Sequence, residues 1–162
     1  MNMILYILIA IATFATMEFI AWAMHKYVMH KWLWFLHEDH HRKEPGFFEK
    51  NDAFFLIFAI PSWLCIMLGS MYNAPVAVSI GAGIAAYGFA YFVVHDVIIH
   101  QRFKLFTRTN NTFIKVVRRA HKMHHKHLDK EHGESFGMLI VNRKYWKKVK
   151  VDEERYGSKS TG

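Results

Sequence analysis

The cationic residues of this chain are confined to two blocks, and this segregation constrains the fold more than any other feature of the sequence. All 21 Lys and Arg residues fall within residues 26–50 and 102–162, whereas residues 1–25 and 51–101 contain none. Hydrophobic residues make up 52% of the chain, so the stretches without cations are strongly apolar. Long apolar stretches between basic blocks are typical of an integral membrane protein.

Three apolar segments are long enough to cross a bilayer, which takes about 20 residues in a helix. They cover residues 2–24, 52–71 and 75–94. Pro75 follows a gap of only three residues and suits the first turn of a helix, so the second and third segments predict a tight helical hairpin. We therefore expect an all-α integral membrane protein that forms a single domain over residues 1–162.

A further amphipathic helix is predicted over residues 113–127. Its apolar stripe contains Phe113, Val116, Val117 and Ala120, and the helix is expected either to lie flat on the lipid headgroups or to insert as a fourth, shorter membrane helix. The basic tail over residues 142–162 predicts a surface element, which is either attracted to anionic lipid or simply solvated. The number of membrane helices is thus three, or four if residues 113–127 insert.

Three crossings bring both basic blocks to the same side of the membrane. The positive-inside rule assigns that side to the cytoplasm. We therefore expect a multi-pass protein of the cell (inner) membrane with its N-terminus outside and a polar cap on the cytoplasmic side. The first apolar run lacks a basic start and is expected to remain in the mature protein rather than to be cleaved.

Ten of the twelve histidines fall into two copies of one compound pattern. Each copy consists of an H-x4-H pair followed by an H-x2-H-H triplet, and each begins where a predicted membrane segment ends. The first copy contains His25, His30, His37, His40 and His41, and the second contains His95, His100, His121, His124 and His125.

Helical geometry gives these spacings a meaning. At about 100° per residue, the three histidines of each triplet share one helix face. The two histidines of each pair are five residues apart and therefore separated by about 140°. Both members of a pair can face one centre only if the helix bends or ends between them.

The histidine pattern predicts a centre with two metal ions. Imidazole suits iron, zinc and copper, and the single Cys65 excludes a thiolate cluster within one chain. Ten ligands exceed the needs of one ion, so four or five are expected for each of two metals, with positions left open for dioxygen or water. His127 and His132 lie outside the pattern and are expected to be exposed loop residues.

The chain also resembles a known family in stretches between the histidines. These are F-F-E-K-N-D at residues 47–52, A-Y-G-F-A-Y-F-V-V-H-D at 86–96, H-Q-R-F at 100–103 and S-F-G at 135–137. Together with the histidines, they resemble the carotenoid hydroxylases of the fatty-acid hydroxylase superfamily, over residues 17–141. All ten histidine positions of that family are filled.

The resemblance implies hydroxylation of carotenoid β-ionone rings at carbon 3, which would convert β-carotene through β-cryptoxanthin to zeaxanthin. It implies two iron ions as cofactors, dioxygen as co-substrate, and a carotenoid that enters from the bilayer lipids. Tyr87, Tyr91 and Phe92 would suit a wall of the substrate site, although helix packing explains these aromatic residues equally well. No nucleic acid is expected as a partner.

The electrons would have to come from a separate protein. The only glycine-rich candidate is Gly81-Ala82-Gly83, which lies inside a predicted membrane segment and follows no strand, so a dinucleotide site is not expected. Small residues there favour close helix packing. A ferredoxin-type donor fits this requirement.

Carboxylates near the histidines are candidates for orienting them or for proton transfer. Asp39, Asp52 and Asp96 lie beside predicted ligands, where each could accept the second N–H of an imidazole or make an ordinary helix-end contact. Glu18 lies within the first membrane segment, seven residues before His25 and on the same helix face. Because ionisable groups are costly in lipid, Glu18 is expected to orient a histidine or relay a proton, or else to bond to another span.

Two other functions compete with this one. Related histidine-rich membrane enzymes hydroxylate or desaturate a fatty acyl chain or a sterol. A metal transporter is the alternative from a different class, but transport sites lie near the middle of the bilayer, whereas these histidines gather at one end of the membrane segments.

Overall fold

The computed structural model describes residues 2–42 and 46–157, and all regular elements in those two ranges are helices. Residues 43–45 and 158–162, which belong to the predicted surface segments, lie outside the described residues. The elements in chain order are α1 (Met3–Met24), π-helix η1 (His25–Trp32), α2 (Trp34–His41), 3-10 helix η2 (Lys50–Asp52), α3 (Ala53–Met71), α4 (Pro75–Tyr91), π-helix η3 (Phe92–Ile99), α5 (Thr112–His124) and α6 (Arg143–Gly157). The prediction of an all-α chain is confirmed.

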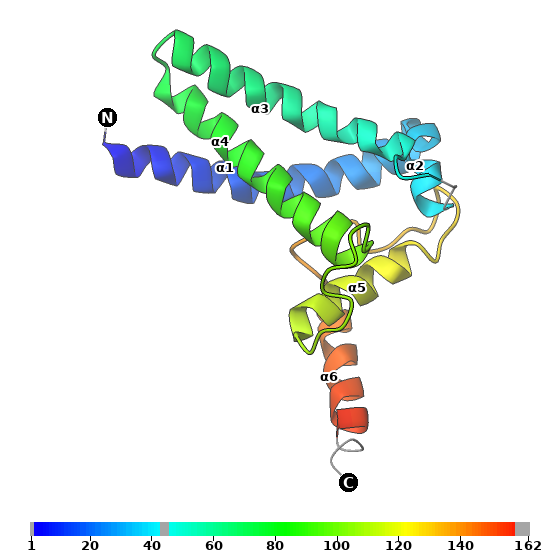
Figure 1. The fold of residues 1–162 in the computed structure, drawn as a ribbon. Coiled ribbons are helices and arrows are strands. Elements are labelled where there is room, and N and C mark those ends of the chain that lie inside the picture. Colours follow the sequence, from blue (N-terminus) through cyan, green and yellow to red (C-terminus); the bar gives the residue numbers. More distant parts are fainter. Residues whose placement is uncertain (1, 43–45, 158–162) are drawn as a thin grey trace.

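Three helical stretches are long and apolar enough to cross a membrane. They are Met3–Trp32, Lys50–Met71 and Pro75–Ile99, and together they form the long arm of the molecule (Figure 1). α3 and α4 make the predicted hairpin, in which the N–H of Ala74 donates to the carbonyl of Gly69 at 2.7 Å. Among the described residues α5 is not such a stretch, so the structure has three membrane-spanning candidates and no fourth.

Small residues let α4 pack closely against both α1 and α3. A Cβ atom at Gly81 would lie 2.7 Å from the carbonyl oxygen of Ser62 in α3, and one at Gly83 would lie 2.5 Å from the carbonyl oxygen of Ala10 in α1. The hydroxyl of Ser62 also donates to the carbonyl of Gly81 at 2.8 Å. The expected role of Gly81 and Gly83 in helix packing is confirmed.

The membrane helices continue past their predicted ends as π-helices, and this corrects the expected geometry of the H-x4-H pairs. The N–H of His100 donates to the carbonyl of His95 at 2.8 Å, and that of Leu33 donates to Val28 at 2.9 Å. Both bonds join residues five apart, which is the register of a π-helix. Residues five apart therefore follow each other on one face, so each histidine pair faces one centre without a bend or an end between its members.

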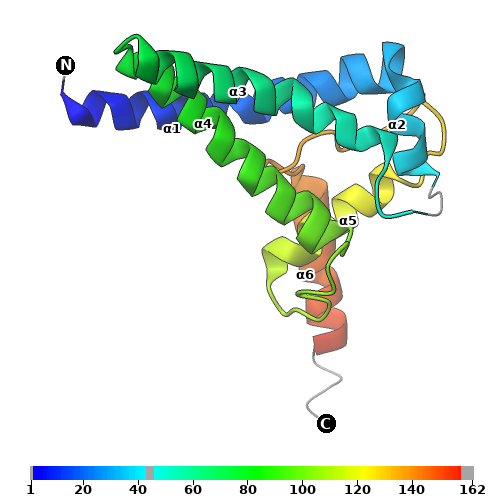
Figure 2. The same ribbon diagram turned by 45° about the horizontal axis from the view of Figure 1, so that its top comes forward.

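The remaining helices form a cap at the end of the membrane helices. The apolar stripe of α5 is covered by protein: Val116 and Ala120 pack against Tyr145 and Val149 of α6, and Val117 packs against Val94 and Met138. The expectation that this stripe faces lipid is therefore wrong, because residues of α6 and η3 cover it. α6 points away from the three long helices (Figure 2).

Candidate metal centre

The ten predicted histidines gather between η1, α2, η3 and α5, and nine of them form two sets. Within each set the ligand nitrogens lie within 4.8 Å of one another. The first set is His25, His30, His37, His41 and His124, and the second set is His40, His95, His100 and His121. The tenth histidine, His125, lies beside the second set, with its Nε2 2.8 Å from that of His121.

The two sets do not follow the two copies of the sequence pattern. His40 comes from the first copy but belongs to the second set, and His124 comes from the second copy but belongs to the first set. The two histidines that belong to the set of the other copy, His40 and His124, both come from triplets. A helix that lies between two centres can direct neighbouring histidines to either side.

The histidines meet through their Nε2 atoms. Six Nε2–Nε2 contacts measure between 2.8 and 3.3 Å. In six of the ten rings the other nitrogen, Nδ1, contacts an oxygen acceptor, which fixes the proton on Nδ1 and leaves a lone pair on Nε2. Each centre is thus lined by nitrogen lone pairs that face one another.

This arrangement fits a metal ion. Two nitrogens that bind one ion at about 2.1 Å and at a right angle are about 3.0 Å apart, which is the separation observed between the Nε2 atoms. Without a cation, buried lone pairs at this distance would repel each other. Nitrogen-only sets of four and five suit a first-row transition metal such as iron.

The acceptors around the first set are neutral. The Nδ1 atoms of His25, His41 and His124 donate to backbone carbonyls, those of Phe136 at 3.1 Å, His127 at 2.8 Å and Glu134 at 3.0 Å. His37 donates to the side-chain oxygen of Asn51 at 2.7 Å. The segment from residue 127 to 136 therefore orients three ligands of the first set.

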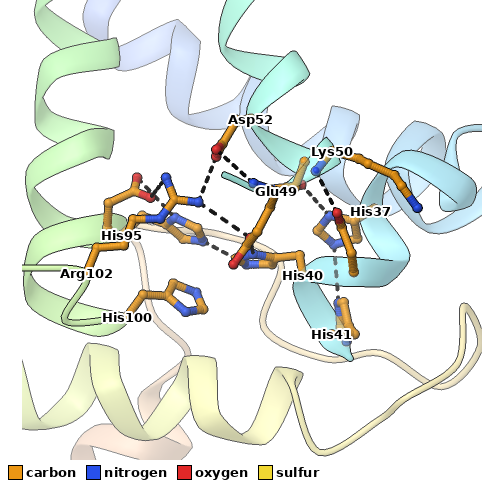
Figure 3. A network of polar contacts seen from close by, with 12 residues as sticks. His37, His40, His41, Glu49, Lys50, Asp52, His95, His100 and Arg102 are labelled. Carbon is orange, nitrogen blue, oxygen red and sulfur yellow. Dashed lines mark hydrogen bonds and ion pairs between the residues drawn. The ribbon is translucent and has the colours of Figure 1, made fainter. Parts of the chain in front are cut away.

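The acceptors around the second set are carboxylates (Figure 3). The Nδ1 of His40 lies 2.7 Å from Glu49 Oε2, and that of His95 lies 3.4 Å from Asp96 Oδ2. Burial raises the pKa of Glu49, and the Arg102 guanidinium beside it acts in the opposite direction. Carboxylate–histidine pairs of this kind make the imidazole a more basic metal ligand.

Burial keeps the cap histidines neutral, as metal ligands must be. Burial lowers the pKa of His37 to about 2, opposed by its hydrogen bond to Asn51 and helped by neighbouring histidines, and burial together with neighbouring histidines lowers the pKa of His125 to about 3. Burial, followed by repulsion from neighbouring histidines, also places the pKa values of His40, His121 and His124 well below the usual value. These five rings are uncharged at neutral pH.

The aspartates predicted to orient histidines lie in different places. Asp96 contacts His95 and Arg102, whereas Asp52 bonds to Arg102 and to the N–H of Glu49. Asp39 accepts from the backbone N–H of Lys50 at 2.6 Å and so ties α2 to the start of the next helix. The contacts of Asp39 and Asp52 within the described residues are thus helix-end contacts rather than bonds to a histidine.

Glu18 bonds to another membrane span, as one of the two expectations had it, and to the cap, and within the described residues no bond joins it to a histidine. Its Oε1 accepts from the N–H groups of Met138, Leu139 and Ile140 at 2.8 to 3.0 Å, and its Oε2 accepts from the Tyr87 hydroxyl at 2.8 Å. The segment that it holds begins two residues after Phe136, whose carbonyl orients His25. Glu18 therefore anchors the chain that supports the first set.

Sequence reasoning missed Glu49 and Asn51 as partners of His40 and His37. Both lie in the F-F-E-K-N-D stretch, so the resemblance marked the segment, but the sequence separations of 9 and 14 residues carry no helical signal. The backbone carbonyls could not be identified from side-chain types. His132 is exposed and His127 half-buried, and neither belongs to a set.

A large apolar cavity of about 800 Å³ leads from the membrane helices to both sets. His25 of the first set and His95 of the second both line it, as do the predicted wall residues Tyr87, Tyr91 and Phe92. Its other lining residues include Phe48, Phe55 and Phe89, which are 82, 65 and 70% exposed. The cavity therefore opens through the apolar surface of the membrane helices.

Comparison with known proteins identifies the family. Residues 10–142 match the model of the fatty acid hydroxylase family. The chain is 44% identical to the beta-carotene hydroxylase of Pantoea ananas over 83% of its own length and 76% of the relative's. It is 37% identical to that of Pseudescherichia vulneris, over 84 and 77%, and 35% identical to a chloroplastic beta-carotene hydroxylase of Capsicum annuum, over 76 and 41%. No solved structure gives a significant match. The protein belongs to the fatty acid hydroxylase family.

Proposed function

We propose that this protein hydroxylates carbon 3 of the β-ionone ring of a carotenoid, with β-carotene as the first substrate. The observation that carries the proposal is the apolar cavity that reaches His25 and His95, one histidine from each set. A substrate ring at its inner end would lie over both centres. The relatives named beta-carotene hydroxylases support the choice of a carotenoid.

Two iron ions, one in each histidine set, are the proposed cofactors. Iron bound there would supply the activation of dioxygen that an unactivated C–H bond requires, which redox-inert zinc does not. The ten histidines would hold the metals through Nε2. Glu49, Asn51 and the carbonyls of residues 127–136 would fix the rings through Nδ1, so that the centre is preorganised.

The cavity walls have a separate task, which is to position the substrate. Tyr91 and Phe92 lie one helical turn before the second set and offer flat apolar surfaces to a ring. The open side, at Phe55 and Phe89, would leave the rest of a long polyene among the lipid tails. This arrangement brings one ring end to the histidines while the other stays outside, which suits a substrate that is modified at both ends.

The cap is proposed to lie on the cytoplasmic side of the inner membrane, because it carries nearly all the Lys and Arg residues. Electrons would come from an acidic ferredoxin-type protein. A polar recess of about 350 Å³ beside His30 is lined by Lys26, Lys31 and Lys130, and the chain has a formal net charge of +8. Such steering weakens with salt, so donor-dependent turnover should fall as ionic strength rises.

Expression in a bacterial host that accumulates β-carotene tests the function. The expected product is zeaxanthin with β-cryptoxanthin as the intermediate, identified by pigment analysis. His121→Ala, His124→Ala and His125→Ala should each abolish conversion while the protein stays in the membrane, and His132→Ala should leave it unaltered. If the unmodified protein left carotene unchanged and modified a fatty acid or sterol, the substrate assignment would be wrong. If all three variants converted carotene at the parent rate, the proposed metal centre would be refuted.

A further inference from the structure

The two histidine sets are supported by groups of different kinds. Around the first set, the acceptors that orient the ligands are three backbone carbonyls and the amide of Asn51. Around the second set, they are the carboxylates of Glu49 and Asp96. Backbone carbonyls are fixed by the fold, whereas a carboxylate on a flexible side chain has to be held in place by something else.

Arg102 is the residue that holds them. One of its terminal nitrogens lies 2.8 Å from Asp52 Oδ1 and 3.7 Å from Glu49 Oε2, and the other lies 3.3 Å from Asp96 Oδ1. Its side chain is only 20% exposed, and its guanidinium lies over the Phe47 ring. Figure 3 shows Arg102 beside His95, with Asp52 and Glu49 facing its guanidinium.

This geometry requires an arginine. The planar guanidinium presents several N–H donors in a fixed fork, so that it can contact three carboxylates at once. A lysine carries the same charge at a single point and cannot bridge the same three groups in these directions. Arg102 also joins two segments that are distant in sequence, residues 49–52 and residue 96. The first segment contains the carboxylate that contacts His40, and residue 96 directly follows His95.

We propose that Arg102 is a positioning residue for the second histidine set: it fixes the two carboxylates that orient His40 and His95, whereas within the described residues it forms no ion pair with an acceptor of the first set. The proposal rests on the two-metal centre proposed above. The two metals should therefore differ in their sensitivity to substitution at this position. Without the Arg102 guanidinium, the carboxylates of Glu49 and Asp96 are no longer held in place and repel each other and Asp52. The imidazoles that they orient then lose their fixed orientation.

Whether substitution of Arg102 weakens or tightens metal binding distinguishes a positioning role from a simple electrostatic effect. Removal of a positive charge close to a metal cation would by itself tighten metal binding. Loss of an orienting group weakens it, typically by about 10- to 100-fold. Arg102→Gln tests both influences together, and Arg102→Lys tests the loss of the fork at constant charge.

The experiment is a titration of the metal-free, full-length protein in detergent with Co²⁺, followed by the visible absorbance of the bound ion. The unmodified protein should bind two equivalents. In Arg102→Lys and Arg102→Gln one of the two equivalents should bind about 10- to 100-fold more weakly than in the unmodified protein, and the other should keep its affinity. Arg119→Gln is the matched control, because Arg119 pairs with Asp152 between α5 and α6 and contacts no histidine in the described residues.

Each outcome decides the matter. If both equivalents keep their affinity in Arg102→Lys, if both weaken equally, or if neither weakens and one binds more tightly in Arg102→Gln, Arg102 is not a positioning residue for the second set. If Arg102→Gln fails to fold, as judged by its far-ultraviolet circular dichroism, Arg102→Lys alone decides. If the unmodified protein binds fewer than two equivalents, the two-metal centre itself is wrong and this inference falls with it, whatever the carotenoid assay shows.

Discussion

Replacement of Glu18 by Ala should detach the cap from the membrane helices. Glu18 accepts four hydrogen bonds, one from Tyr87 and three from consecutive backbone N–H groups. Two of these donors, the Met138 N–H and the Tyr87 hydroxyl, belong to residues that are only 5 and 3% exposed, so water cannot replace the carboxylate there. The other two N–H groups lie closer to the surface and can be rehydrated.

The magnitude follows from the two buried donors. A buried donor left without a partner costs about 1–3 kcal/mol, so Glu18→Ala should lower the free energy of unfolding by about 2–6 kcal/mol. Glu18→Gln keeps an acceptor of the same shape but loses the charge, so its cost should be smaller. Tyr87→Phe removes only one of the four bonds and should also cost less than Glu18→Ala.

Unfolding in mixed micelles of detergent and SDS, followed by circular dichroism, measures how the variants rank in free energy of unfolding. Thr16→Ala is the control, because Thr16 lies in the same helix, is exposed and bonds only within α1 in the described residues. Metal content should fall in Glu18→Ala as well, since residues 134–140 also carry the carbonyls that orient His25 and His124. If Glu18→Ala were as stable as Thr16→Ala, the anchoring role of Glu18 would be refuted.

Three further predictions follow from the packing and the histidine sets. His124→Ala should weaken metal binding at the first set and His40→Ala should weaken metal binding at the second, although each histidine lies in the other copy of the sequence pattern. The same Co²⁺ titration checks this. An assignment of the histidines by sequence copy would give the reverse result. Gly83→Ala should cost about 1–3 kcal/mol through its clash with α1, whereas Gly88→Ala meets nothing within 4 Å and should not destabilise; thermal unfolding compares them. The folded-state pKa of His125 is lowered to about 3 from 6.5, so the stability that its neutral form contributes is complete above about pH 6.5 and is lost as the pH falls toward 3. The unfolding temperature of the metal-free protein should therefore drop between pH 7.5 and pH 5. A constant unfolding temperature would contradict the burial of this ring.

The membrane helices could be predicted from the sequence because hydrophobicity and charge are summed over many residues. The hairpin turn before Pro75 and the packing glycines Gly81 and Gly83 also have local signals. The helix ends could not be predicted in the same way. Residues 25–32 and 92–99 continue their helices in the π register, and no residue type in the sequence marks this register.

The convergence of the candidate ligands could be predicted from spacing, but their division into two sets could not. Spacing places His37, His40 and His41 on one helix face and says nothing about which centre each one reaches. The division depends on where α2 and α5 lie between the other helices, which is a tertiary property. The same holds for Glu18, whose partners are 69 and 120 to 122 residues away.

The division of the histidines also bears on biosynthesis. The first set needs His124 and the second needs His121, and both residues lie in α5, after the third membrane segment. Neither centre is complete on the ribosome until all three segments have been synthesised. Metal loading at the proposed centres would therefore require α5 as well as the three membrane segments, and a nascent or truncated chain that ends before α5 would present only partial sets of histidines.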